Sequence, residues 1–254
     1  MQENELNYYE KIGNWEFEQI KYTVERLSNW DFYEKIKEYT NETSVCLDLG
    51  TGGGEKVLKY YPEVGKIYGT DFSAEMIKTA KENAKMYPNR NIEFLQMDNL
   101  NMGFPDEMFD LVSARHTVIN AKQIYKTLKN DSVLIIEGVD KKDCWEIKEI
   151  FGRGQAYYDR IAISKKDYED LKEAGFNKIE LVEVLEDEYY ETEEDLLALL
   201  LKTPILDDFS EEDNSSFIHR KEIEKDLFQE YVNKYKTDKG ILLKRVLYGI
   251  VVKK

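Results

Sequence analysis

The chain has 254 residues, of which 42% are hydrophobic, enough for the core of one α/β domain with an insertion. Its formal net charge of −15, from 51 acidic and 36 basic residues, argues against nucleic acid and an anionic membrane surface as partners. The polar, acidic first residues and the lack of a long apolar run predict a cytoplasmic protein. Cys46 and Cys144 have no metal-ligand spacing, so we expect no metal site.

The predicted elements begin with helices. Over residues 1–40, hydrophobic residues recur at helical spacing, as in Phe17, Ile20, Val24 and Leu27, which predicts an N-terminal helical cap. Apolar runs then alternate with helical patterns, one of them capped by Ser73. The predicted strands cover residues 44–49, 66–70, 92–97, 109–114 and 132–138, and a helix is predicted over 120–128. This alternation indicates a parallel sheet with helices on both faces.

The C-terminal part has a different pattern. Residues 165–174 form a predicted helix with Ser164 as its N-cap and Gly175 just past its end. Two further strands are predicted over residues 178–185 and 240–252. Between them, residues 193–202 and 222–236 have amphipathic helical patterns, in a stretch too long for a structureless loop. The predicted domains are therefore the cap 1–40, a main domain of residues 41–185 and 237–254, and a helical insertion, 186–236, expected to be a lid.

A glycine-rich loop follows the first predicted strand. Residues 45–55 read VCLDLGTGGGE, an apolar run with one acid that breaks into four glycines before a helical stretch. Such a strand, loop and helix predict a nucleotide site, because the loop amides and the helix N-terminus point at the ligand. A dinucleotide fingerprint needs a third glycine at Glu55. The spacing of Asp48, Gly50, Gly52 and Gly54 instead resembles motif I of the class I S-adenosylmethionine (SAM)-dependent methyltransferases.

A second acid lies where a ribose-binding carboxylate belongs. Asp71 ends the second predicted strand, about 20 residues past the glycine loop. One carboxylate can accept two hydrogen bonds from the vicinal diol of a ribose, and charge-assisted bonds are strong. The alternative is that Asp71 only begins the turn into the helix capped by Ser73.

The resemblance covers about residues 44–137. In the family, an acid after the third strand accepts a hydrogen bond from the adenine amine and the next backbone amide contacts the ring, which matches Asp98 and Asn99. The alternative is that this pair only forms a turn. Residues 104–112, FPDEMFDLV, match the family's approach to the fourth strand. Residues 128–132, LKNDS, depart from the proline-glycine-glycine turn that many members have before the fifth strand.

The resemblance implies both a fold and a cofactor site. The implied fold is a three-layer Rossmann-like α/β fold with a mostly parallel seven-stranded sheet, an antiparallel C-terminal strand and a helical lid insertion. The implied cofactor is SAM, with Asp48 near its ammonium group, through water. The residues expected to bind it are Asp48, Gly50, Thr51, Gly52, Gly54, Asp71, Phe72, Asp98, Asn99 and Arg115.

Arg115 and His116 follow the fourth predicted strand, where family members place residues that touch the methionine moiety and the acceptor. The guanidinium of Arg115 can bind a carboxylate of SAM or of the substrate. His116 is one of two histidines, and imidazole suits a general base near neutral pH. The alternative is that His116 only shapes the pocket.

The sequence therefore predicts a methyltransferase that transfers a methyl group from SAM to a neutral or cationic small molecule. The runner-up is an RNA methyltransferase. Two more classes of protein share parts of this pattern: a nicotinamide-dependent oxidoreductase, against which Glu55 argues, and a non-catalytic SAM-binding protein. The sequence predicts no oligomeric state.

Overall fold

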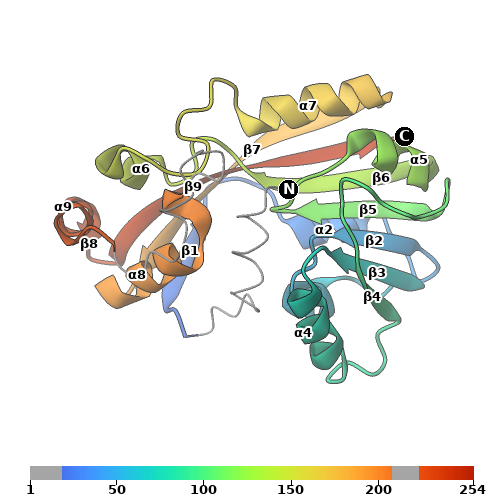
Figure 1. Cartoon of the computed structure of the whole chain (residues 1–254), viewed down its shortest axis with the longest axis horizontal. Helices are drawn as coiled ribbons and strands as arrows, with labels where there is room; N and C mark the ends of the chain where they lie inside the picture. Colours follow the sequence, from blue (N-terminus) through green and yellow to red (C-terminus); the bar gives the residue numbers. More distant parts are fainter. Residues whose placement is uncertain (1–18, 208–222) are drawn as a thin grey trace.

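The computed structural model describes residues 19–207 and 223–254, which form one twisted sheet with helices on both faces (Figure 1). The sheet has nine strands, in the order β1-β7-β9-β6-β5-β2-β3-β4, with the short β8 paired to β9. The strands are β1 Tyr22–Arg26, β2 Val45–Leu49, β3 Lys66–Asp71, β4 Ile92–Gln96, β5 Phe109–Arg115, β6 Leu128–Val139, β7 Lys178–Tyr190, β8 Lys236–Thr237 and β9 Gly240–Lys253.

Five neighbouring strands, β4, β3, β2, β5 and β6, pair in parallel, whereas β9 is antiparallel to both β6 and β7. The predicted fold class is therefore confirmed: a mostly parallel α/β sheet with an antiparallel C-terminal strand. The seven expected strands are present, and β1 and β8 are additions. In a parallel sheet, ligands bind beyond the carboxyl ends of the strands.

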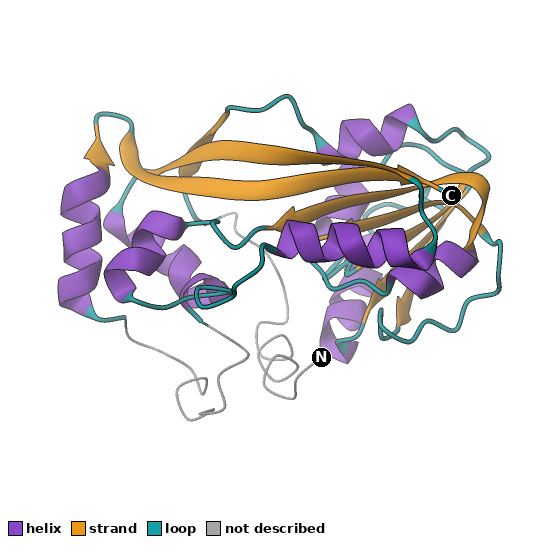
Figure 2. Ribbon diagram, turned by 90° about the horizontal axis from the view of Figure 1, so that it is seen from above, coloured by secondary structure: helices purple, strands orange, loops and turns teal. Residues whose placement is uncertain are grey.

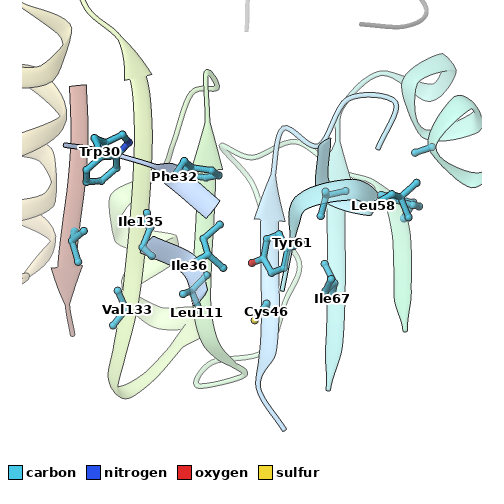
Figure 3. Close-up of a cluster of buried hydrophobic side chains, with 14 of the residues drawn as sticks. Trp30, Phe32, Ile36, Cys46, Leu58, Tyr61, Ile67, Leu111, Val133 and Ile135 are labelled. Carbon is cyan, nitrogen blue, oxygen red and sulfur yellow. The ribbon is translucent and has the colours of Figure 1, made fainter. Parts of the chain in front are cut away.

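The helices make the outer two layers. They are α2 Phe32–Glu38, α3 Glu55–Tyr60, α4 Ala74–Ala84, α5 Ala121–Thr127, α6 Trp145–Phe151, α7 Ile163–Ala174, α8 Glu193–Lys202 and α9 Lys225–Tyr235, with a 3₁₀ turn at Pro204–Leu206. On one face, α2, α3 and α4 bury residues such as Ile36 and Leu58 against Cys46 and Leu111 of the sheet (Figure 3). On the other face, α5 and α7 pack against β6 and β9. The described helices do not combine the length and apolar character that a bilayer crossing requires.

The two longest strands carry a part of the fold that extends beyond the parallel strands (Figure 2). We define this wing as β1, β8, residues 186–190 of β7 and residues 240–246 of β9. A separate hydrophobic cluster joins the wing to α6, α8 and α9, including Leu196, Tyr231 and Leu243. The predicted strand 178–185 thus continues to Tyr190, whereas the two helices predicted in the insertion are confirmed as α8 and α9.

The helical prediction for the N-terminal region is wrong at Tyr22–Arg26, which forms strand β1 and pairs antiparallel with Glu186–Tyr190. Ile20, Val24 and Leu27 do have helical spacing, but the pairing of this segment with β7 outweighs that local preference. The local sequence does not encode this tertiary pairing. Phe17 lies outside the described residues. Helix α2 confirms the helical prediction for the later part of residues 1–40.

The N-cap prediction for Ser164 is also wrong. Helix α7 begins at Ile163, after Ala162. A distant side chain supplies the cap, because Asp140 accepts hydrogen bonds from the Ile163 backbone amide (3.0 Å) and the Ser164 hydroxyl (2.7 Å). The predictions that Ser73 caps α4 and that Gly175 follows the end of α7 are confirmed.

Candidate active site at the carboxyl ends of the parallel strands

The glycine loop between β2 and α3 has a backbone that only glycine tolerates well. Gly50, Gly52 and Gly54 have φ values of 69°, 58° and 79°. A Cβ atom at Gly50 would lie 2.6 Å from Cβ of Thr117, and one at Gly54 would lie 2.9 Å from the Phe94 ring. The loop is therefore packed tightly against the ends of the neighbouring strands, leaving its backbone close to any ligand above it.

Thr51 lies within this loop, and its hydrogen bonds indicate whether the loop fits a ligand. Its backbone amide donates to the carbonyl oxygen of Thr70 at 2.8 Å, which ties the loop to β3. Its hydroxyl is buried and makes no hydrogen bond of normal geometry to the described residues. The hydroxyl lies close enough to Asp48 to lower the pKa of that carboxyl, and a polar ligand in the loop would give it a better-aligned hydrogen bond. The loop therefore fits a polar ligand such as the predicted cofactor.

Asp48 lies at the end of β2 directly below the loop and is 7% exposed. One carboxylate oxygen accepts a hydrogen bond from the Ser113 hydroxyl at 2.7 Å. Burial raises the pKa of Asp48 to about 6, although the Ser113 hydrogen bond, the nearby Thr51 hydroxyl and the charge of Arg115 act in the opposite direction. An ionised Asp48 is therefore a poorly solvated negative charge that a ligand ammonium would stabilise.

Asp71 ends β3 and connects the glycine loop to α4. Its Oδ2 accepts from the Gly52 backbone amide at 3.0 Å, and its Oδ1 accepts from the Ser73 backbone amide at 3.0 Å. Burial raises its pKa, opposed by these backbone hydrogen bonds. The turn into α4 is thus part of its role, and the direct bond to the glycine loop fixes the carboxylate at the rim of the predicted ligand site.

Asp98 and Asn99 follow β4 and differ in exposure. Asp98 is exposed, and its Oδ1 accepts from the backbone amide of Leu100 at 2.9 Å. Asn99 is buried: its side chain accepts from the Thr70 hydroxyl at 3.3 Å and donates to the Thr117 hydroxyl at 3.1 Å. The Asn99 side chain therefore joins the loops after β3, β4 and β5, which leaves its backbone as the part suited to ligand contact.

Phe72 lies between these acids at the start of the β3–α4 connection and is half-buried. Its carbonyl oxygen accepts from the Gln96 side chain at 3.0 Å, which joins the ends of β3 and β4. The fold therefore brings the predicted cofactor residues of three strands together at one edge of the sheet.

Arg115 is the last residue of β5, beside Glu137 of β6 in register. Its Nε donates to Oε1 of Glu137 at 2.7 Å, and Oε2 of Glu137 accepts from Nε1 of Trp30 at 2.8 Å. The two terminal guanidinium nitrogens make no hydrogen bond to any described residue, and the side chain is 35% exposed. Arg115 therefore keeps most of its donors for a ligand.

His116 follows directly and has a left-handed backbone, with φ of 52°. Its backbone amide donates to the Glu137 carbonyl at 2.8 Å, and its Nε2 lies 3.6 Å from Oε1 of Glu137. Burial and the charges of Arg115, Arg245 and Lys56 hold the pKa of His116 well below its ordinary value. The imidazole is therefore neutral at neutral pH, and the neighbouring positive charges make it a weaker base than an ordinary histidine.

Two residues that the sequence interpretation did not select belong to this region. Glu137 is 7% exposed. In the sequence, the one signal for its role was that it is a single acid within an apolar strand. Tyr33 of α2 has its pKa raised by burial and by the nearby charge of Asp48, so its hydroxyl stays protonated. Trp30 and Tyr33 both belong to the predicted N-terminal cap, so residues of the cap contribute to the site. Among the described residues, no group of acids, histidines and cysteines is placed to hold a metal ion.

The sheet, the glycine loop after β2 and the acids at or just past the ends of β2, β3 and β4 define a Rossmann-like α/β protein. Residues 40–175, more than half of the chain, match the model of a family described as "Methyltransferase domain", and the chain belongs to that family.

Relatives agree with this assignment. A 2-phytyl-1,4-naphtoquinone methyltransferase of Nostoc punctiforme is 36% identical over 90 residues, which is 34% of this chain and 39% of that protein. A demethylmenaquinone methyltransferase of Oceanobacillus iheyensis is 24% identical over 192 residues, which is 63% of this chain and 80% of that protein. The solved structure of the YcgJ protein of Bacillus subtilis has the same fold, with a TM-score of 0.55, 13% identity, and 87% and 96% of the two chains covered.

Proposed function

We propose that the protein binds SAM at the carboxyl ends of β2, β3 and β4 and transfers its methyl group to a small molecule. The observation that carries this proposal is the hydrogen bond between the Gly52 amide and Asp71, because it joins the two parts of the predicted site. SAM supplies an electrophilic methyl group on a sulfonium. The protein holds the acceptor in line with that methyl group and excludes water.

The proposed cofactor contacts follow from the position of each group. Asp71 binds the ribose diol, while Asp98 and the Asn99 backbone bind the adenine beside Phe72. Asp48 faces the ammonium group, and the buried Thr51 hydroxyl binds a polar atom of the cofactor. Gly50, Gly52 and Gly54 allow the backbone to approach closely.

The proposed acceptor is a neutral or cationic small molecule. On the sheet face that carries Asp48 and Arg115, the pKa of Glu186 is raised by burial and by the negative charges of Glu137 and Glu188. Such carboxylates favour a cation or a hydrogen bond donor over the phosphates of RNA, as does the net charge of −15. Neutral His116 would take the proton of an acceptor that must lose one. The name of the Nostoc relative makes a naphthoquinone the alternative acceptor.

The insertion and the location belong to the same proposal. Helices α8 and α9 lie beside the wing, and we assign to the insertion the role of a lid over the acceptor. We also propose a cytoplasmic location, in line with the net charge of −15, which argues against an anionic membrane surface.

The test uses SAM with a labelled methyl group and three acceptor pools: a water-soluble metabolite extract, a lipid extract and total RNA. We expect label in the water-soluble pool. Label in RNA alone would overturn the small-molecule assignment, and label in the lipid pool alone would favour the quinone. A parallel thermal-shift measurement compares SAM with NADH, and stabilisation by NADH alone would overturn the methyltransferase assignment.

A further inference from the structure

We propose that Glu137 is a positioning residue of the cofactor site, which holds Arg115 so that its two terminal nitrogens bind the carboxylate of the methionine moiety. This inference rests on the proposed function. Its basis is one carboxylate with two short hydrogen bonds, to Arg115 at 2.7 Å and to Trp30 at 2.8 Å, in a side chain that is almost fully buried. A carboxylate held from both sides fixes the direction of the guanidinium.

The sheet itself sets this arrangement. Glu137 pairs in register with Arg115 on one side and with Gly249 of β9 on the other. A Cβ atom at Gly249 would lie 2.5 Å from the Trp30 ring, so the absence of a side chain there lets the indole lie against the sheet. From that position the indole nitrogen reaches Glu137, and the N-terminal region thereby fixes the orientation of a residue at the ligand edge.

Arg115 and Asp48 together match an amino acid. Asp48 of β2 pairs in register with Ser113 of β5, two residues before Arg115, so the side chains of Asp48 and Arg115 lie on the same face of neighbouring strands. The charge of Arg115 lowers the pKa of Asp48. Among the described residues they make no direct ion pair, and Arg115 gives its Nε to Glu137. An acid and a guanidinium held side by side but apart complement the ammonium and carboxylate of an α-amino acid.

The chain offers a matched control for Glu137. Glu188 is 6% exposed and lies between an arginine and an aromatic donor in the same way, accepting from Arg245 at 2.9 Å and from the Tyr190 hydroxyl at 2.6 Å. Replacing either glutamate by glutamine removes one buried carboxylate charge beside one arginine, and Arg245 keeps Asp143 as a second partner. Of the two glutamates, Glu137 contacts the arginine whose terminal nitrogens make no hydrogen bond to the described residues.

The experiment compares two probes by calorimetry: S-adenosylhomocysteine (SAH), which has the amino acid group, and 5′-methylthioadenosine, which lacks it. We expect Glu137→Gln and Arg115→Lys each to weaken SAH binding about tenfold and to leave methylthioadenosine binding unchanged. The double variant should bind SAH no more weakly than Arg115→Lys alone, because Glu137 acts through Arg115. Glu188→Gln should keep the wild-type preference for SAH.

An unchanged SAH preference in Glu137→Gln, beside a reduced preference in Arg115→Lys, would overturn the positioning role. Equal weakening of both probes would also overturn it, because that result indicates a general loss of structure. If Glu137→Gln does not fold, Glu137→Asp keeps the charge but shortens the side chain, and the same loss of SAH preference is expected. A wild-type protein that binds neither probe would instead contradict the proposed function.

Discussion

Two arginines on one face of the sheet differ in how many of their donors the protein uses. In the wing, Arg245 gives Nε and one terminal nitrogen to Asp143 and the other to Glu188, at 2.9–3.1 Å, and its side chain is 15% exposed. At the ligand edge, Arg115 gives only Nε to Glu137. In the wing, all three guanidinium nitrogens of Arg245 are bonded. At the ligand edge, the two terminal nitrogens of Arg115 make no hydrogen bond to the described residues.

The difference separates a structural role from a binding role. An arginine whose three guanidinium nitrogens each bind a buried carboxylate contributes to a defined fold and has little left for a ligand. A guanidinium that is held by one atom and free at two is preorganised for an anion. Changes to the Arg245 cluster should therefore alter stability, and changes around Arg115 should alter ligand binding.

The largest expected effect is on stability. Arg245→Ala leaves the carboxylates of Asp143 and Glu188 buried without their cation, and we expect it to lower the free energy of unfolding by about 3–5 kcal/mol in urea. SAH affinity of the folded protein should stay near that of the wild type. A stable Arg245→Ala protein that has lost SAH binding would reverse the two roles.

The next largest effect concerns catalysis. His116→Ala should bind SAH normally but reduce turnover on the order of 100-fold, because it removes the neutral imidazole that accepts a proton. Single-turnover kinetics with labelled SAM measure this step. His219, outside the described residues, provides the control as His219→Ala. Turnover as in the wild type would leave His116 as a packing residue.

A smaller effect is expected at the ribose. Asp71→Ala should weaken SAM binding by about tenfold or more, because it removes a charge-assisted contact and the anchor of the glycine loop at Gly52. Calorimetric titration of both proteins with SAM gives the affinities. Equal affinities would refute the ribose role.

The smallest expected effect is a pH dependence of binding. Since the pKa of Asp48 is raised to about 6 in the folded protein, Asp48 is ionised at pH 7 and protonated at pH 5. SAH affinity should therefore fall as the pH drops through 6, by up to about tenfold, because only the ionised form attracts the ammonium group. Asp48→Asn should remove most of this dependence. A dependence that persists in Asp48→Asn would place the titrating group elsewhere, with Asp71 the next to replace.

The parallel half of the sheet was predictable because its signals are local. Apolar runs, glycines and acids at strand ends lie within a few residues of one another. The sequence therefore sufficed to place the loop at Gly50–Gly54, Asp71 and Asp98 at the carboxyl ends of their strands. The wing was less predictable, since β1 exists only by pairing with a strand more than 150 residues away. Glu137 was missed for the same reason, because its partner Trp30 is 107 residues distant.

The central claim is that the edge formed by β2, β3, β4 and β5 holds SAM with Asp71 on the ribose and the free end of Arg115 on a carboxylate. The most direct measurement is a crystal structure of the protein with SAH. We predict the adenosyl group between the glycine loop and Asp98, with the methionine carboxylate on the terminal nitrogens of Arg115. SAH bound elsewhere, or bound at this edge with its carboxylate away from Arg115, would contradict the account.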